Sequence, residues 1–398
     1  MTVTEDIIEL EHKYVLQTYK RPDFVLESGE GVWLYDSDGR EYLDGGSGIA
    51  VNALGYQNQA IIAALRQAAD SLIHVSNLYH TAPQALLARD LCENSFADRV
   101  FFCNSGAEAN EGALKFARKW ARTQGHTDKT GIVAFTGSFH GRTMGALACT
   151  ATEKYRKPFE PLIGDVSFAQ FNDLDSARQA ITDKTCAVMI EPVQGEGGVT
   201  PADPDFLTGL RQICDETGAL LIFDEIQCGL GRTGTLWAYE GYHVTPDIMT
   251  LAKPLAGGLP IGAILLTQTV ADALGPGDHG STFAGGPLVC TVAHSVFRHI
   301  NTPVFLQQVK SHSDYMATQL NNRVVASPLI EQVRGKGLMW GLVSVPPAAD
   351  IMVEARKFGL IVLVAGPNVV RLLPPLTISQ DEIDELVDRL VKTLEAVG

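Results

Sequence analysis

Two residues of opposite charge follow short apolar segments in the middle of the chain. Residues 219–223 predict a buried strand that ends at Asp224, and residues 247–252 form a second apolar run that ends at Lys253. Open α/β sheets bind their ligands at the carboxyl ends of strands. We therefore expect Asp224 and Lys253 to meet at one edge of a sheet. Pro254 favours an extended backbone at Lys253 over a helical one.

A structural salt bridge is the ordinary role for such a pair. Five glycines flank it: Gly229, Gly231, Gly234, Gly257 and Gly258. Because glycines let the backbone approach another group closely, they favour a ligand site instead. Pyridoxal phosphate catalysis uses this pair of groups: a lysine forms a Schiff base with the cofactor aldehyde, and an acid keeps the pyridine nitrogen protonated. On this hypothesis Lys253 is the Schiff-base residue and Asp224 is the acid.

The composition is that of an ordinary globular protein. The chain has 398 residues, of which 45% are hydrophobic and 19% are charged, so we expect two or three domains. Its 46 acidic and 31 basic residues give a net charge of −15, which argues against nucleic acid or an anionic membrane as the main partner.

Cysteine usage and the first residues predict a cytoplasmic protein. The seven cysteines include no CxxC pair and mostly lie in apolar runs, as reduced core thiols do. Residues 1–19 are acidic and amphipathic, unlike a signal peptide, and no apolar stretch reaches transmembrane length. We predict no metal site.

An α/β fold with a mostly parallel sheet is predicted for the middle of the chain. Short apolar segments alternate there with longer helical patterns, which is typical of a parallel sheet with helices on both faces. The predicted strands are residues 99–104, 131–135, 186–191, 219–224, 246–252 and 261–266. A helical pattern over 288–299 leads out of this region.

Smaller units are predicted on either side. Before the sheet we expect a helix over 5–19, a hairpin around Asp38-Gly39 within 31–44 and a helix over 59–73. After it we expect a smaller α+β lobe, with strands at 333–345, 359–364 and 369–373 and helices at 350–358 and 379–396. The predicted domains are an N-terminal segment (1–52), a large domain (53–300) and a C-terminal domain (301–398).

Residues 101–110 predict a strand that runs into a helix. Ser105 and Glu108 have the spacing of a capping box, which by itself would explain both. Gly106 adds a second interpretation, because it lets the amides of Gly106 and Ala107 approach a phosphate at the positive end of the helix. Both interpretations stay open at this point.

Several other segments offer polar groups to a site. Phe139 and Arg142 suit a planar ring face and a carboxylate anchor, although a core phenylalanine beside a surface arginine would look the same. Ser281 and Thr282 offer hydroxyls for a phosphate or for a turn. Arg371 lies between apolar residues of a predicted strand and needs an acidic partner if it is buried.

Two further patterns argue against other enzyme classes. Glu191 and Glu196 are close in sequence, but nothing fixes the separation that a glycosidase would need. Residues 229–234 (GLGRTG) match the dinucleotide pattern GxGxxG, yet they do not open a helix, so we do not expect a dinucleotide site.

Taken together, the motifs resemble the class III (subgroup II) pyridoxal-phosphate aminotransferases. They are NSGAEANE, SFHGRT, EPVQGEGG, LIFDEIQCGLGRTG, LAKPLAGG and GSTFAGGP, in this order. Within the family the resemblance is greatest to the acetylornithine branch, with ornithine aminotransferases nearby, and it covers nearly the whole chain. It implies the fold type I of pyridoxal-phosphate transferases and a homodimer with active sites at the subunit interface.

The resemblance implies cofactor roles for the matching residues. Lys253 would be the Schiff-base residue and carry the proton between substrate and cofactor, while Asp224 would pair with the pyridine nitrogen. Phe139 and Ile226 would enclose the ring, and Gln227 would reach its phenolic oxygen. The phosphate would be held by a further group: Ser105, Gly106, Ala107 and, from the other subunit, Thr282.

It also implies how substrates bind. Arg142 would hold a substrate carboxylate, and Ser281 would lie near the substrate. Glu196 and Arg371 would form a gate, in which the glutamate masks the arginine for one substrate and releases it for the other.

The chain departs from the family pattern in two places. Ala107 stands where many acetylornithine enzymes carry threonine, so one hydroxyl contact to the phosphate is missing. Tyr56, Gln57 and Asn58 stand where the family has a histidine followed by a His-Pro pair.

The implied reaction moves the terminal amino group of N-acetylornithine, or of a close ω-amino donor, to 2-oxoglutarate. It gives a semialdehyde and glutamate and belongs to arginine biosynthesis. Ornithine, 4-aminobutyrate and carrier-linked lysine are alternative donors. An aminomutase acting on glutamate semialdehyde would share the fold and cofactor but would need no 2-oxoglutarate. A non-catalytic binding protein is a third class, against which the presence of both Lys253 and Asp224 argues.

Overall fold

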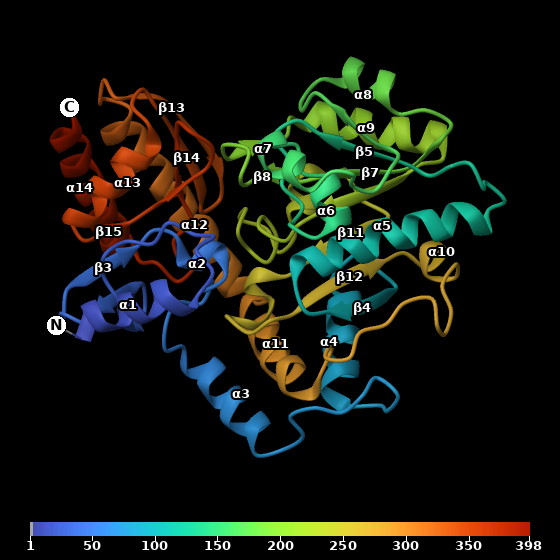
Figure 1. Ribbon diagram of the computed structural model, residues 1–398, viewed down its shortest axis with the longest axis horizontal. Helices are drawn as coiled ribbons and strands as arrows, with labels where there is room; N and C mark the ends of the chain where they lie inside the picture. The colour runs from blue at the N-terminus through green and yellow to red at the C-terminus, as the bar shows by residue number, and fades with distance from the viewer. Residues whose placement is uncertain (1–2) are drawn as a thin grey trace.

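A seven-stranded sheet forms the centre of the larger of two lobes (Figure 1), which we call the large lobe. The computed structural model describes residues 3–398. The strand order is β4-β12-β11-β10-β7-β5-β6, and β12 alone runs antiparallel to its neighbours in this sheet. The strands are β4 (Arg99–Cys103), β5 (Gly131–Phe135), β6 (Val166–Ala169), β7 (Thr185–Ile190), β10 (Leu220–Asp224), β11 (Ile248–Leu251) and β12 (Gly262–Leu266). The predicted α/β fold with a mostly parallel sheet is confirmed.

Both faces of this sheet are buried. In β10, Leu220 and Ile222 pack into the apolar cluster beneath α5 (Gly106–Thr123), while Leu221 and Phe223 pack into the cluster beneath α9 (Pro204–Thr217). Successive side chains of a strand point to opposite faces, so a strand covered on both sides must be apolar throughout. This is why the central strands were recognisable as unbroken apolar runs.

Further helices surround the sheet and connect it to the smaller lobe. Helix α11 (Pro287–Ile300) leaves the large lobe where the helical pattern predicted it. The remaining helices of the large lobe are α3 (Gln59–Ala69), α4 (Ala82–Glu93), α6 (Met144–Ala148), α7 (Glu153–Arg156), α8 (Leu174–Ala180) and α10 (Gln268–Ala271), with short helical turns η1 (Lys157–Phe159), η2 (Ala238–Tyr242) and η3 (Lys253–Ala256). The strands β8 (Val193–Gln194) and β9 (Thr200–Pro201) pair to form an antiparallel two-stranded ribbon.

The small lobe is an antiparallel sheet covered by helices. Its strand order is β13-β14-β17-β16. The elements are β13 (Ile330–Lys336), β14 (Met339–Ser344), β16 (Leu363–Val364), β17 (Val369–Leu372), α12 (Pro303–Gln319), η4 (Leu320–Val324), α13 (Ala348–Lys357) and α14 (Gln380–Val397). The sequence did not predict α12, whose buried stripe includes Ser313 and is therefore not a continuous apolar pattern.

The N-terminal strands pack beside the last part of the chain (Figure 1). The predicted hairpin is confirmed as β2 (Trp33–Asp36) and β3 (Glu41–Asp44), next to β1 (Leu26–Glu30). Strand β3 pairs with β15 (Leu360–Ile361) from the far end of the sequence. The helix expected over 5–19 is α1 (Val3–Tyr14). The division into domains at residues 52 and 300 stays a prediction.

The GLGRTG segment joins the two lobes. Gly231 and Gly234 have left-handed φ angles of 88° and 93°, so the chain turns tightly on either side of Arg232. The Arg232 guanidinium is buried, and its Nη1 donates to the carbonyls of Leu338 (2.9 Å) and Pro374 (2.6 Å) in the small lobe. The segment is thus a structural link, as its failure to open a helix suggested.

A left-handed turn follows the hairpin. The φ angles of residues 47–50, which form α2 (Ser47–Ala50), are 42°, 62°, 65° and 63°. Left-handed backbone is unfavourable for residues with a side chain, so the turn needs outside support. Asp44 supplies it by accepting the amides of Gly46 (2.8 Å) and Ser47 (3.0 Å) and the Tyr56 hydroxyl (2.6 Å).

Asn58 begins α3 in the segment that departs from the family pattern. Its side chain accepts the amides of Ala60 (3.0 Å) and Ile61 (3.4 Å). We predict that Asn58→Ala lowers the free energy of unfolding by about 1 kcal/mol, because first-turn amides lose their acceptor. Asn58→Ser keeps an acceptor and should stay close to the parent. Urea denaturation at fixed protein concentration measures both; an Asn58→Ala protein as stable as the parent would contradict this role.

Glu225 ties the end of β10 to η2. Its carboxylate accepts the amides of Ala238 (2.6 Å) and Tyr239 (2.8 Å). Burial raises the pKa of Glu225 from its ordinary value of 4.5 to about 8, and these two hydrogen bonds offset only part of the effect.

A raised pKa makes stability depend on pH. The contribution of Glu225 is fully present below about pH 4.5 and is lost as the pH rises through about 8. The free energy of unfolding of the parent, minus that of Glu225→Gln, should therefore fall across this range in a pH series of denaturation curves. Glu153→Gln, at an exposed site, should show no such fall. A pH-independent difference for Glu225→Gln would refute the expectation.

Candidate active site

The carboxyl ends of β4, β5, β7, β10 and β11 surround a cavity of about 430 Å³, which we call the central cavity. Parallel strands place these ends at one edge of the sheet, as expected. The structure brings most of the predicted site residues together along its wall: Ser105, Gly106, Ala107, Phe139, Arg142, Asp224, Ile226, Gln227 and Lys253.

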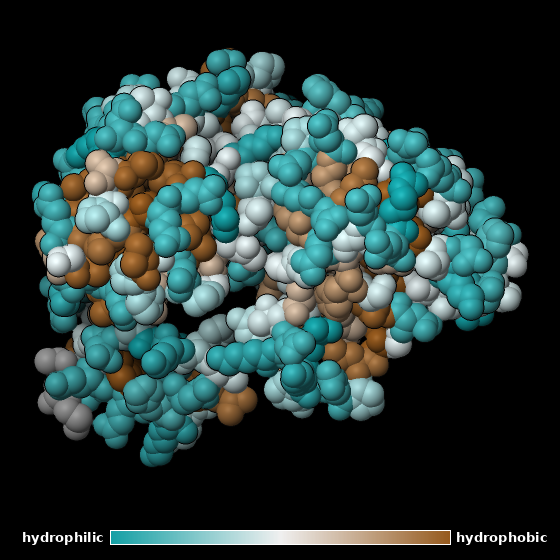
Figure 2. All heavy atoms as spheres, turned by 90° about the horizontal axis from the view of Figure 1, so that it is seen from above, coloured by the Kyte–Doolittle hydropathy of each residue, from teal (hydrophilic) through white to brown (hydrophobic). Residues whose placement is uncertain are grey.

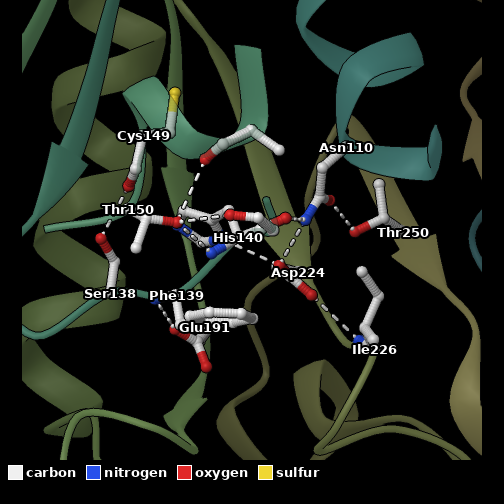
Figure 3. Close-up of polar contacts among 12 residues, drawn as sticks. Asn110, Ser138, Phe139, His140, Cys149, Thr150, Glu191, Asp224, Ile226 and Thr250 are labelled. Carbon is white, nitrogen blue, oxygen red and sulfur yellow. Dashed lines mark hydrogen bonds and ion pairs between the residues drawn. The ribbon is translucent and has the colours of Figure 1, made fainter. Parts of the chain in front are cut away.

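Asp224 is fixed by donors from three separate parts of the chain (Figure 3). Its Oδ2 lies 2.8 Å from Asn110 Nδ2 and 2.8 Å from His140 Nδ1, and its Oδ1 accepts the Ile226 amide at 3.1 Å. Thr250 in turn donates to Asn110 Oδ1 at 2.8 Å. The carboxylate therefore has one orientation, set by α5, by the segment after β5 and by its own loop.

The candidate site also contains His140 and Asn110, which contact Asp224 and which the sequence did not predict as site residues. Burial alone would lower the pKa of His140, but the hydrogen bond and charge of Asp224 outweigh it and raise the pKa. Asn110 lies four residues after Gly106 and so shares its face of α5. That spacing, and the position of His140 next to Phe139, were the available signals.

Glu191 orients the aromatic wall of the cavity. Its carboxylate accepts the amides of Phe139 and Gly195, both at 3.0 Å. Burial raises the pKa of Glu191 to about 7, while the neighbouring His140 acts in the opposite direction. Glu191 thus supports the site by holding backbone on both sides of it.

Lys253 has a strained backbone, which corrects the expectation of an extended one. Its φ is +34°, and it begins the helical turn η3 with Pro254 in the first turn. A proline is well tolerated in a first turn, so here it marks the start of a helix. Strain of this kind persists where surrounding structure imposes it, commonly at functional sites.

The amine of Lys253 is also perturbed. Burial lowers its pKa, the charge of Asp224 acts against this, and the charge of Arg371 adds to it. A lysine with a lowered pKa carries its proton less often, so more of it is present as the free amine that can act as a nucleophile or accept a proton.

The start of α5 combines the two interpretations of residues 105–108. Ser105 caps the helix by accepting the Glu108 amide at 3.2 Å. The second half of the expected capping box is altered, because Glu108 Oε2 accepts from the backbone and side chain of Asn104 (2.7 and 2.8 Å). The amides of Gly106 and Ala107 belong to the first turn, which has no intrahelical acceptors, and both residues line the cavity.

Arg142 lies at the mouth of the cavity against aromatic rings. Its guanidinium carbon is 3.6 Å from the Tyr155 ring centroid and 5.5 Å from that of Phe139. Cation–π contacts of this kind position an arginine while its hydrogen-bond donors stay available.

Glu196 and Arg371 form an ion pair, which we call the masking pair. Arg371 Nη1 lies 2.6 Å from Glu196 Oε1 and donates to Gln227 Oε1 at 3.1 Å. The Arg371 side chain is 3% exposed, whereas that of Glu196 is 33% exposed. The acidic partner expected for a buried Arg371 is therefore Glu196, and Gln227 links the pair to the wall of the central cavity.

Ser281 and Thr282 lie outside the central cavity of their own chain. They border a second cavity together with Asn77, Gln84 and His279. Ser281 Oγ accepts from Asn104 Nδ2 at 3.0 Å, which ties this loop to the strand end that precedes α5.

The cavity fits a phosphorylated pyridine aldehyde. The first-turn amides of α5 suit a phosphate, and Asp224 suits a ring nitrogen that carries a proton. Phe139 and Ile226, which also line the cavity, offer apolar surfaces, and Lys253 offers an amine. A Cβ at position 106 would lie 2.8 Å from Ile226 Cδ1, so glycine is needed for Ile226 to reach this wall.

Comparison with known proteins agrees with this chemistry. The aminotransferase class-III family model matches residues 14–394. The chain is 49% identical to the mitochondrial acetylornithine aminotransferase of Alnus glutinosa, over 99% of this chain and 89% of that one. It is 47% identical to a succinylornithine transaminase of Yersinia pseudotuberculosis, over 97% and 95% of the two chains.

Solved structures give the same result. An ornithine aminotransferase from Toxoplasma gondii superimposes with a TM-score of 0.95 at 30% identity, covering 99% of this chain and 95% of that one. The N-acetylornithine aminotransferase of Stenotrophomonas maltophilia superimposes with a TM-score of 0.85 at 39% identity, covering 98% and 99%. The chain belongs to the class-III aminotransferases, which are pyridoxal-phosphate enzymes.

Proposed function

We propose that this enzyme moves the terminal amino group of N-acetylornithine, or of a close ω-amino donor such as N-succinylornithine, to 2-oxoglutarate. The products are a semialdehyde and glutamate, as in arginine biosynthesis. The observation that carries this proposal is the masking pair, which Gln227 links to the cavity wall, together with a second arginine, Arg142, that lines the cavity and has no carboxylate partner among the described residues.

Two arginines, one of them masked, suit two unlike substrates. Glutamate and 2-oxoglutarate have two carboxylates and need both Arg142 and Arg371. An N-acylated ornithine presents a single carboxylate beyond a long aliphatic chain, and an unmasked Arg371 would then be a buried charge without a partner. Such a charge costs several kcal/mol. Glu196 neutralises it in the donor half-reaction and moves away in the glutamate half-reaction.

The remaining residues hold the cofactor and move a proton. When bound, pyridoxal phosphate supplies an electron sink for the bond that loses its proton. Asp224 would hold its ring nitrogen protonated, Gln227 would contact the phenolic oxygen, and the amides of Gly106 and Ala107 would hold the phosphate beside Ser105. Lys253 Nζ would remove the proton from the carbon that carries the amine and carry it from the substrate to the cofactor.

We also propose a homodimer with shared sites. Thr282 is exposed and lies outside its own central cavity, next to Phe283, whose side chain is 69% exposed. The surface carries apolar patches among hydrophilic residues (Figure 2). Strongly exposed apolar side chains also include Leu72, Ile73, Leu78 and Tyr79. A second copy would cover such residues and let Thr282 reach the phosphate site of its partner.

We propose the cytoplasm as the compartment. All seven cysteines are free thiols, as is usual in a reducing environment. Within residues 3–398 the helices are all too short or too polar to cross a bilayer.

A screen of donors against acceptors tests the reaction. We predict transamination of 2-oxoglutarate with N-acetylornithine or N-succinylornithine, faster than with ornithine, 4-aminobutyrate or a carrier-linked lysine. Lys253→Ala should retain the cofactor but lose turnover by several powers of ten, and Lys157→Ala, a surface control, should lose none. Isomerisation of glutamate semialdehyde without 2-oxoglutarate would replace the proposal with an aminomutase.

Glu196→Ala tests the masking pair. Without Glu196 the donor half-reaction leaves Arg371 uncompensated, so its single-turnover rate should fall about tenfold or more, while the glutamate half-reaction is spared. Absorbance changes of the cofactor in each half-reaction give both rates, and Glu153→Ala serves as a surface control. Equal losses in the two half-reactions would rule out masking.

A further inference from the structure

Three residues lie in line across the small-lobe sheet where it faces the large lobe. Arg334 of β13 is opposite Gly341 of β14, and Gly341 is opposite Arg371 of β17. Residues directly opposite each other on antiparallel strands project from the same face. Arg334 and Arg371 therefore emerge on one face, separated by a residue that has no side chain.

The loop that carries Glu196 lies on this line. We call residues 195–199 the masking loop. A Cβ at position 341 would lie 2.8 Å from Val199 Cβ and 3.0 Å from the Gly198 carbonyl oxygen. The masking loop thus packs directly against Gly341, between the two arginines.

The two arginines hold the masking loop at two points, Gly198 and Glu196. Arg334 donates from Nε (3.0 Å) and Nη2 (2.9 Å) to the Gly198 carbonyl, and Arg371 binds the Glu196 side chain at 2.6 Å. One arginine fixes the loop through its backbone and the other through its carboxylate.

The loop needs this support. Gly198 and Val199 have left-handed φ angles of 93° and 52°, and such a conformation at a residue with a branched side chain is unfavourable without outside contacts. Arg334 provides such contacts, since its hydrogen-bond partners in the described chain are the Gly198 carbonyl and the Gln332 amide oxygen at 3.4 Å.

We propose that Arg334 is a positioning residue that sets how closely Glu196 masks Arg371, and so sets the preference of the enzyme between one-carboxylate donors and dicarboxylates. The inference rests on the proposed function of the masking pair. A loop held at two points presents Glu196 to Arg371 at a high effective concentration. Loss of the contact at Gly198 lowers that effective concentration. Loss of the Arg334 contact should therefore favour the unmasked state.

The main test compares half-reaction rates in three variants. Arg334→Met keeps the aliphatic chain but removes the donors, and the ratio of the N-acetylornithine rate to the glutamate rate should fall about tenfold, as for one lost charge-assisted hydrogen bond. Arg334→Lys, which keeps the positive charge and a single donor nitrogen, should give a smaller fall. Gly341→Ala adds a methyl group where the masking loop packs against β14, and it should shift the ratio in the same direction.

Lys336→Met is the matched control. Lys336 lies two residues further along β13, on the same face, and also reaches the large lobe, where its Nζ is 3.5 Å from the Tyr242 ring centroid. It does not contact the masking loop in the described structure. Its replacement should leave the ratio unchanged, which separates the masking loop from lobe contact in general.

Hydrogen exchange gives a readout that is independent of turnover. Amides of residues 195–199 in the cofactor-loaded enzyme should exchange faster in Arg334→Met than in the parent or in Lys336→Met. In a Glu196→Ala background, Arg334→Met should change the rate ratio no further, because there is no carboxylate left to position.

The outcomes distinguish failure of the proposed role of Arg334 from failure of the proposed masking function of Glu196. If Glu196→Ala is selective for the donor half-reaction but Arg334→Met leaves the ratio unchanged, or lowers both rates equally, Arg334 does not position the masking loop. If Glu196→Ala itself is unselective, the masking function fails and the role of Arg334 fails with it. Selective loss in both, absent from Lys336→Met, supports the proposal.

Discussion

A buried carboxylate at the end of β10 is the constraint on which the site depends. Asp224 is 3% exposed, and a charge so far from water is tolerated only if other groups compensate it. Asn110, His140 and the Ile226 amide supply three hydrogen bonds. These donors come from α5, from the segment after β5 and from the loop after β10, so satisfying one charge fixes three walls of the cavity. The same helix that carries Asn110 also places the amides of Gly106 and Ala107, the proposed phosphate site, along the cavity wall.

The substrate side is built by contacts between lobes. Arg232 reaches from the large lobe to carbonyls of the small lobe, and Arg334 reaches back to the masking loop. Both arginines donate to backbone carbonyls, so they hold segments of the two lobes together. On the proposed function, Arg371 is compensated by Glu196 in one half-reaction and by a substrate carboxylate in the other, as two unlike substrates require.

The sequence predicted best what depends on local pattern. Apolar runs located the central strands and the edge at which Asp224 and Lys253 meet. Strand β6 was missed because it is a short edge strand, only partly buried. The extended backbone predicted for Lys253 was wrong, since Pro254 is compatible with a helix start as well as with an extended neighbour. For Asn110 and His140 the local signals were only their positions near Gly106 and Phe139, and their roles, like that of Arg334, depend on partners more than thirty residues away along the chain.

The most direct test of this account is nitrogen NMR of the enzyme loaded with pyridoxal phosphate that is isotopically labelled at the ring nitrogen. If Asp224 acts as the acid that its fixed orientation suggests, the ring nitrogen of the parent enzyme is protonated near neutral pH. In Asp224→Asn, which keeps the shape of the side chain without its charge, the same nitrogen is unprotonated. An unprotonated ring nitrogen in the parent enzyme would contradict the account.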